Sequence, residues 1–145
     1  MTRRRYRPTQ RELDSARWYL MFDLTTSARQ QRERAVIYED KNTLALAAAE
    51  RLEELAASVP DVSAQALADY AKARRIEEKT GNADFMHCSI TSQIGFAINP
   101  QTIDDLCRVY ACAVECFRHS PFAENGSIAD FWDEFLTTAH VLRTP

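Results

Sequence analysis

Apolar residues recur every three or four positions over most of the chain, which is the spacing of one face of an α-helix. The first such stretch has its apolar positions at Leu13, Ala16, Leu20 and Leu24. Just before it, Thr9 and Glu12 have the spacing of a capping box, in which each side chain accepts a hydrogen bond from the backbone amide of the other. We therefore expect a helix that begins near Gln10 and continues or bends through the hydroxyl-rich segment 25–27.

This helix carries large aromatic residues on a second side. Trp18 and Phe22 project almost opposite to the leucines, so the helix is apolar on two sides. One interpretation places it centrally in a bundle, with both sides buried. The other leaves Trp18 and Phe22 to meet a partner or a second copy of the chain, as in a homodimer. We favour the central position, because large apolar side chains are more often buried than exposed.

A second helix is predicted after Asn42 or Thr43, either of which can cap it, and before Pro60, which ends it. Its inward positions are expected to be Leu44, Ala48, Leu52, Leu55 and Val59. Many alanines lie between positions 45 and 57. Because alanine is small, a neighbouring helix can approach this one closely.

A third helix is predicted from a cap at Ser63 to Lys79, since Gly81 then ends the helical pattern. Its inward positions are expected to be Leu67, Tyr70, Ala71 and the aliphatic stem of Arg74. The neighbouring carboxylates of Glu77 and Glu78 are expected on a solvated face.

The segment 82–99 carries two patterns at once. Ile90, Ile94 and Ile98 are four apart as in a helix, yet alternate residues from Ile94 onward also suit a strand. We interpret the segment as helix.

Another helix is predicted to begin at Asn99–Pro100, with the proline at the first helical position, and to run to about His119. Its buried face is expected at Ile103, Leu106, Cys107, Tyr110, Val114 and Phe117. A loop over 120–126 follows, and a cap within 127–130 starts a final helix. The residues that this last helix packs are expected to include Ile128, Phe131 and Phe135.

The composition agrees with these helices. Only three glycines and five prolines occur among 145 residues, which is too few for an all-β protein with many tight turns. We therefore expect an all-α, single-domain helical bundle of about five to six helices, with a basic N-terminal arm over 1–8 and the helical domain over 9–145. The chain has no apolar stretch of the length needed for export or for crossing a membrane, so we expect a cytoplasmic protein. We also expect the four cysteines to be reduced, because a chain of this size can build a core without disulfides.

Positive charge is concentrated near the start of the chain. Nine of the fifteen arginines fall in residues 1–34, against four acidic residues, so this segment carries a charge of +5. The other 111 residues carry nine basic and seventeen acidic side chains, a charge of −8. Guanidinium groups stay charged and bind phosphate or carboxylate through two parallel hydrogen bonds, which predicts docking on an acidic partner. The candidate contact residues are Arg3, Arg4, Arg5, Tyr6, Arg7, Arg11, Arg17, Arg29, Arg32 and Arg34.

We therefore expect a non-catalytic binding or regulatory protein, or a small subunit of a larger complex, that docks on nucleic acid or on an acidic protein. Tyr6 could stack on a base while the arginines contact phosphates. In the plainest alternative, the arginines pair with the protein's own acidic surface, such as Asp130, Asp133 and Glu134. In a third view, the acidic body opposes a basic surface, as in small phage- or plasmid-type inhibitors that act by protein–protein contact.

A metal- or thiol-dependent protein is a further alternative. Cys112, Cys116 and His119 follow the spacing i, i+4, i+7 along one flank of their predicted helix. A fourth ligand from His87, Cys88 or His140 would complete a tetrahedral zinc site. This is a weak candidate, because the paired Cys-x-x-Cys elements of structural zinc sites are missing.

Sequence signatures of enzymes are also missing. The three glycines are isolated, so there is no glycine-rich phosphate loop, and no Gly-x-Ser-x-Gly elbow occurs. We therefore expect no enzyme and no cofactor.

Overall fold

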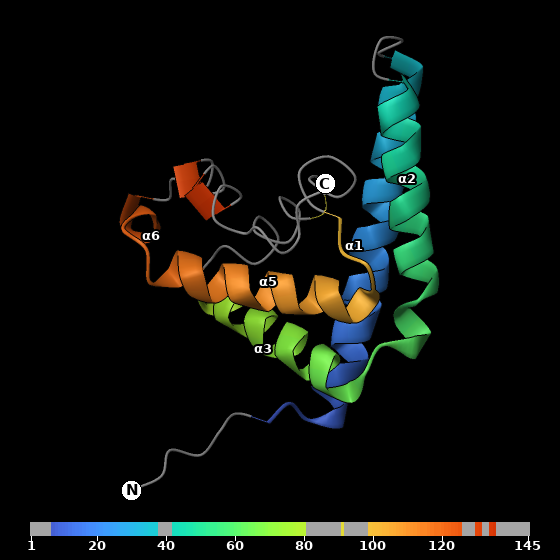
Figure 1. The fold of residues 1–145 in the computed structure, drawn as a ribbon. Helices are drawn as coiled ribbons and strands as arrows, with labels where there is room; N and C mark the ends of the chain where they lie inside the picture. The colour runs from blue at the N-terminus through green and yellow to red at the C-terminus, as the bar shows by residue number, and fades with distance from the viewer. Residues whose placement is uncertain are drawn as a thin grey trace, which may run out of the picture.

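The computed structural model describes residues 7–37, 42–80, 91, 99–125, 130–131 and 134–135. Its helices are α1 (Gln10–Ile37), α2 (Asn42–Ala57), α3 (Ala64–Thr80), α5 (Ile103–Arg118) and the short α6 (Phe122–Asn125), with a 3₁₀ turn η2 (Val59–Asp61) (Figure 1). These residues form no strand. The predicted all-α bundle of about five helices is therefore confirmed.

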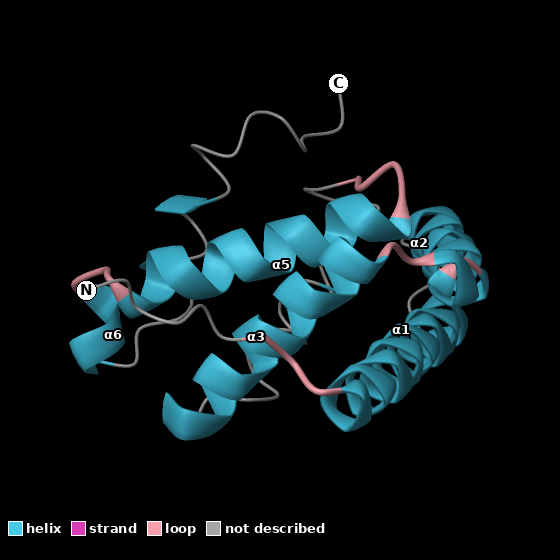
Figure 2. Ribbon diagram, turned by 90° about the horizontal axis from the view of Figure 1, so that it is seen from below, coloured by secondary structure: helices cyan, strands magenta, loops and turns pink. Residues whose placement is uncertain are grey.

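The bundle is made of two helix pairs that cross. α1 and α2 lie side by side as one hairpin, and α3 packs against α5 as the second pair. α3 also contacts α1, so the second pair is joined to the lower part of the hairpin (Figures 1 and 2). The far ends of α1 and α2 project beyond α3 and α5.

The first predicted helix is correct at its start and along its length. The amide of Thr9 donates to Oε1 of Glu12 over 3.2 Å, and the amide of Glu12 donates to Oγ1 of Thr9 over 3.2 Å. This is the capping box expected from the sequence. The helix continues unbroken through 25–27, where the hydroxyl of Thr25 donates to the carbonyl of Met21 over 2.7 Å.

Small side chains allow α1 and α2 to pack closely, as predicted. Ala48 and Ala49 of α2 are fully buried, and Leu20 and Leu24 of α1 are buried with them. Leu44 is an exception to the predicted inward face, since it is 56% exposed and Ala45 is buried in its place. The reason is that successive residues of a helix are 100° apart, and the buried positions Ala45, Ala48, Ala49 and Leu52 define a face that leaves Leu44 at its edge.

The pair α3 and α5 builds the rest of the core. The rings of Tyr70 and Tyr110 lie 5.0 Å apart between the two helices, and both side chains are fully buried. The cap at Ser63 is confirmed, because its Oγ accepts a hydrogen bond from the amide of Ala66 over 3.1 Å. The predicted buried face of α5 is confirmed at all six positions: Ile103, Leu106, Cys107, Tyr110, Val114 and Phe117.

The predicted start of α5 at Pro100 was wrong. The helix begins three residues later, at Ile103, and Thr102 is its N-cap. Oγ1 of Thr102 accepts a hydrogen bond from the amide of Asp105 over 3.1 Å, which satisfies an amide that has no partner within the helix. Pro100 suits the first position of a helix. Here the side chain of Thr102 caps the helix instead, so the helix begins after Thr102 and not at Pro100.

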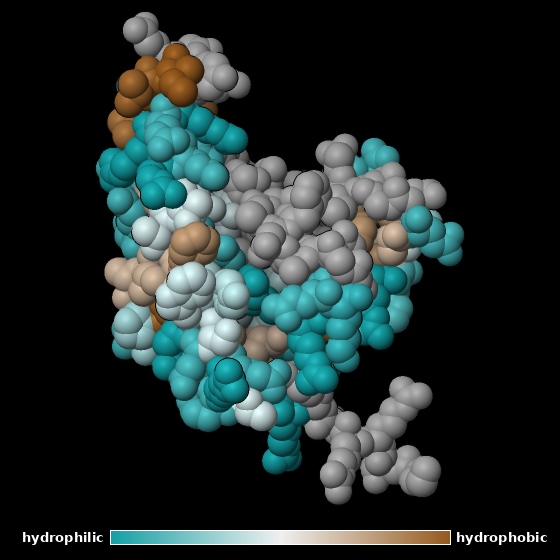
Figure 3. Space-filling model, turned by 180° about the vertical axis from the view of Figure 1, so that it is seen from behind, coloured by the Kyte–Doolittle hydropathy of each residue, from teal (hydrophilic) through white to brown (hydrophobic). Residues whose placement is uncertain are grey.

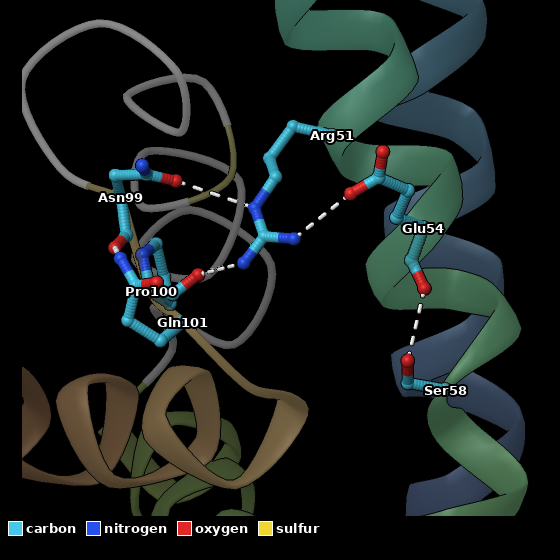
Figure 4. Close-up of polar contacts among 6 residues, drawn as sticks. All are labelled: Arg51, Glu54, Ser58, Asn99, Pro100 and Gln101. Carbon is cyan, nitrogen blue, oxygen red and sulfur yellow. Dashed lines mark hydrogen bonds and ion pairs between the residues drawn. The ribbon is translucent and has the colours of Figure 1, made fainter.

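Arg51 of α2 fixes the segment that leads into α5. Its guanidinium donates to Oδ1 of Asn99 over 3.2 Å and to the carbonyl oxygen of Pro100, and it also contacts Glu54 over 3.0 Å (Figure 4). The side chain is only 24% exposed. The planar guanidinium of Arg51 therefore joins α2 to the residues that precede α5. A lysine ammonium could not make the same set of hydrogen bonds with this geometry.

The predictions for segment 82–99, for the loop over 120–126 and for the last helix can be compared with the structure only in part. Of segment 82–99, only Thr91, which is helical and buried, and Asn99 lie within the described residues. The predicted loop over 120–126 contains the short α6. Phe131 and Phe135 of the predicted last helix are helical and buried, while Ile128 lies outside the described residues. No helix in the described part of the chain is both long and apolar enough to cross a membrane.

Candidate functional site

All six candidate arginines within the described residues are exposed: Arg7, Arg11, Arg17, Arg29, Arg32 and Arg34. The others, Arg3, Arg4, Arg5 and Tyr6, lie outside the described residues. Arg32 pairs with Glu53 of α2. Toward the carboxylates of the described residues, the remaining five make no ion pair. Pairing with the protein's own acidic surface, the plainest alternative considered above, is therefore seen for Arg32 but not for the other five described arginines.

These arginines do not form a single patch. At 100° per residue, Arg11 and Arg29 share one outer stripe of α1, whereas Arg17 and Arg34 project from other sides. The outer stripe lies opposite the buried side chains of Leu20 and Leu24. It also contains Trp18 and Phe22, so that α1 presents aromatic and cationic side chains together.

The interpretation that α1 is buried on both sides was wrong. Trp18 is 59% exposed and Phe22 is 50% exposed. α3 packs against the side of α1 that carries Tyr19 and Asp23, and Trp18 and Phe22 stay exposed on the outer stripe. The preference of large apolar residues for the interior is overridden here by the number of helices available to cover them.

The exposed aromatic side chains contact one another. The rings of Trp18 and Phe22 are stacked, with centroids 5.1 Å apart and planes 8° apart. Tyr19 meets Trp18 edge to face at 5.0 Å. We refer to Trp18, Tyr19 and Phe22 as the aromatic ledge. The spacing i, i+4 puts Trp18 and Phe22 one turn apart, which is why they can stack.

A groove of about 510 Å³ opens beside this ledge, between α1 and α3. Arg11 and Tyr19 line it from α1, and Arg75 and Lys79 line it from α3. Two carboxylates also line it, and Oε2 of Glu12 lies 4.0 Å from Nη1 of Arg75 across the two helices. We call this feature the α1–α3 groove. Tyr19 belongs both to the groove and to the ledge, so the two form one continuous surface.

Arg74 forms the floor of the groove. The residue is 5% exposed, and its guanidinium lies 3.3 Å from Oδ2 of Asp23 and 4.1 Å from the ring centroid of Tyr19. The prediction buried only the aliphatic stem, but the structure buries the charged head as well. Burial by itself would lower the pKa of Arg74, but Tyr70, Tyr110 and Asp23 outweigh it and raise that pKa. Asp23 thus balances the charge of Arg74, while Arg11, Arg75 and Lys79 face solvent.

The expectation that Glu77 is solvated was wrong. Glu77 is 3% exposed, and its carboxylate accepts a hydrogen bond from the hydroxyl of Tyr110. Glu78, the next residue, is exposed as predicted. Burial, and then the nearby charge of Glu77, raise the pKa of Tyr110 above its ordinary value. α5 supplies the donor that makes burial of this carboxylate tolerable, which the pattern along α3 alone could not reveal.

The predicted metal ligands are only partly brought together. The sulfur atoms of Cys112 and Cys116 lie 4.0 Å apart on the exposed side of α5. His119 is directed to Glu115, with 3.4 Å between Nε2 and Oε2. Among the residues with defined positions, no three histidine, cysteine or acidic side chains form a group that could hold a metal ion. His87, Cys88 and His140 lie outside those residues.

Sequence reasoning did not identify Tyr19, Arg75 or Lys79 as parts of the site. Each looks like an ordinary exposed residue of an amphipathic helix, and they become neighbours only when α3 packs across α1. The one signal in the sequence that pointed to Tyr19 was its position next to Trp18 and three residues before Phe22.

Comparison with known proteins gives no family for this chain. No protein-family model, curated protein or solved structure matches it at a significant level.

Proposed function

We propose that this is a non-catalytic binding protein that docks on an anionic macromolecule through the exposed arginines of α1 and of the residues just before it. The proposal rests on one observation: Arg7, Arg11, Arg17, Arg29 and Arg34 are exposed and make no ion pair with the described carboxylates. Exposed cationic side chains that have no ion-pair partner on their own protein favour an external partner of opposite charge.

The contrast with Arg32 supports this proposal. Arg32 and Glu53 face each other across α1 and α2, and the hydrogen bond from Arg32 lowers the pKa of Glu53. The carboxylate of Glu53 on α2 thus balances the charge of one guanidinium of α1, that of Arg32. No such partner among the described residues stands opposite Arg11 or Arg29, which leaves these side chains available.

The spread of the arginines favours an extended partner. Arg11 and Arg29 are 18 residues apart, which corresponds to about 27 Å along a helix that rises 1.5 Å per residue. A small anion could meet only one of them. A nucleic acid strand or an acidic protein segment could meet both.

The test compares two variants that each lose three positive charges. R11A/R17A/R29A removes exposed arginines of α1, and K72A/R108A/R118A removes exposed cations from α3 and α5. Fluorescence anisotropy would measure binding of labelled single-stranded DNA, duplex DNA and polyglutamate between about 50 and 200 mM salt. We expect the α1 variant to bind at least one of these more weakly, with a flatter salt dependence, and the control to bind like wild type. Equal loss in both variants, or no binding by wild type at low salt, would reject the proposal.

A second candidate function rests on the 4.0 Å between the sulfur atoms of Cys112 and Cys116. Two thiolates one helical turn apart can bind the same soft cation, with further ligands from elsewhere. Burial, and then the neighbouring Cys112, raise the pKa of Cys116, so the metal must compete with its proton. We propose elemental analysis of purified wild type and of C112S/C116S after zinc addition and dialysis. Near-stoichiometric zinc in wild type alone would support this function, and equal zinc contents would exclude it.

A further inference from the structure

We infer that the aromatic ledge and the α1–α3 groove form a binding surface for single-stranded nucleic acid. This inference rests on the proposed function, because it names the class of anionic partner that the exposed arginines of α1 receive. It adds a requirement that general docking does not have, namely contact between flat rings and unpaired bases.

The ledge has the geometry of a stacking platform. Trp18 and Phe22 are parallel within 8° and remain 59% and 50% exposed, so the stack can be extended by another flat ring from outside. Every base has a π-face, and stacking on an aromatic side chain contributes about 1–3 kcal/mol per base. Tyr19 holds Trp18 edge to face, which limits the freedom that Trp18 would otherwise lose on binding.

Cationic side chains lie where the backbone of such a strand would run. Along the outer stripe of α1, Arg11 precedes Trp18 and Arg29 follows Phe22 by seven residues, which is about 10 Å along the helix axis. Arg75 and Lys79 line the adjoining groove. The groove is also lined by Glu12 and Glu78, and its cations outnumber these two carboxylates. Cationic grooves combined with exposed aromatic faces are the general design of surfaces that bind single strands.

Duplex DNA and acidic proteins fit this surface less well. In a duplex the bases are stacked on one another, so their faces are not available to Trp18 and Phe22. An acidic peptide could pair with Arg11, but it would leave the exposed rings without a partner of matching shape. The combination of the two kinds of side chain therefore selects unpaired bases.

The experiment uses the full chain and a ten-residue oligothymidylate as probe. W18A/F22A removes the stacked pair, and V36A/I37A removes apolar side chains that are more exposed still, at the tip of the α1–α2 hairpin, where hydrophobic residues gather (Figure 3). We expect W18A/F22A to weaken oligothymidylate binding about 5- to 150-fold, because the variant loses the stacking of at least one base. Binding of duplex DNA and polyglutamate should change little, and V36A/I37A should bind all three like wild type. Tryptophan fluorescence of wild type should fall on titration, and this quenching should be much smaller in W18F.

The outcomes separate this inference from the proposed function. If W18A/F22A binds oligothymidylate as tightly as wild type, the inference is wrong. If R11A/R17A/R29A then still weakens binding of duplex DNA or polyglutamate, the proposed function stands without it. If wild type binds none of the three polyanions at low salt, both are wrong. Trp18 and Phe22 are both exposed, so their substitution should leave the core intact. Circular dichroism would show that the W18A/F22A variant keeps its helices.

Discussion

Arg74 of α3 and Asp23 of α1 form an ion pair, 3.3 Å between Nη1 and Oδ2, with side chains that are only 7% and 13% exposed. The pair joins the α1–α2 hairpin to the α3–α5 pair at the base of the α1–α3 groove. Because the pair is desolvated, each charge depends on the other. The same guanidinium lies against Tyr19, so the pair also positions one edge of the aromatic ledge.

Removing one partner of this pair should be costly. Asp23→Leu leaves the guanidinium of Arg74 buried without its carboxylate, and we expect the free energy of unfolding to fall by about 3 kcal/mol. Urea unfolding followed by circular dichroism would measure the change. D23L/R74M, which replaces both charges with apolar side chains, should recover most of the loss. The single variant R74M completes the comparison. If the loss of unfolding free energy in D23L/R74M equals the sum of the losses in D23L and R74M, the two charges do not depend on each other.

Alkaline pH should destabilise the protein through its buried tyrosines. Burial raises the pKa values of Tyr70 and Tyr110 above the ordinary value of about 10. In the folded state these hydroxyls hold their protons more tightly than in the unfolded state. The stabilisation is therefore complete below about pH 10 and is lost as pH rises above it.

Two measurements check this prediction. In an absorbance titration of the five tyrosines, Tyr70 and Tyr110 should ionise only when the protein unfolds. The free energy of unfolding should depend less steeply on pH above 10 in Y110F than in wild type. At neutral pH, Y110F should cost about 1–3 kcal/mol, because Glu77 loses a buried donor. Ionisation of all tyrosines before unfolding would contradict the prediction.

The fork of Arg51 should stabilise the entry of α5. Arg51→Ala removes hydrogen bonds to Asn99 and to the carbonyl of Pro100, and we expect a loss of about 1–2 kcal/mol in the free energy of unfolding. Hydrogen exchange should become faster in the first turn of α5. E50A, at an exposed neighbouring position on α2, is the control and should change neither quantity. Unchanged exchange in R51A would mean that the contact does not hold this segment.

The three described cysteines should differ in reactivity. Cys107 is fully buried, and burial raises its pKa to about 12, so it should react with iodoacetamide only when the protein unfolds. Cys112 and Cys116 are exposed and should be labelled in the folded state. Burial raises the pKa of Cys116, so its labelling should be slow at pH 7 and should accelerate as pH rises past 9. Peptide mapping by mass spectrometry identifies each site, and early labelling of Cys107 would show that α5 is not packed as described.

The local features of the chain could be read from its residues. The capping box of Thr9 and Glu12, the cap at Ser63 and the buried face of α5 all depend on side chains within a few positions of one another. Short-range hydrogen bonds and helical periodicity are properties of the sequence itself. The positions of the arginines were equally clear.

Contacts between helices could not be read in the same way. Glu77 resembled a solvated carboxylate until Tyr110, 33 positions away, supplied its donor. Trp18 and Phe22 resembled core residues because periodicity shows that a side is apolar but does not show whether another helix covers it. Arg74 resembled a residue with a solvated head until Asp23 balanced its charge.

By itself, the sequence therefore determined that this chain is helical, where most of its helices begin and end, and that positive charge gathers in its first 34 residues. The tertiary structure alone decided which carboxylates meet which cations across different helices, and it placed Arg75 and Lys79 beside Tyr19. The physical reason is one of range. Helix formation and capping are decided among residues within one or two turns, whereas burial and charge pairing depend on how whole helices cross.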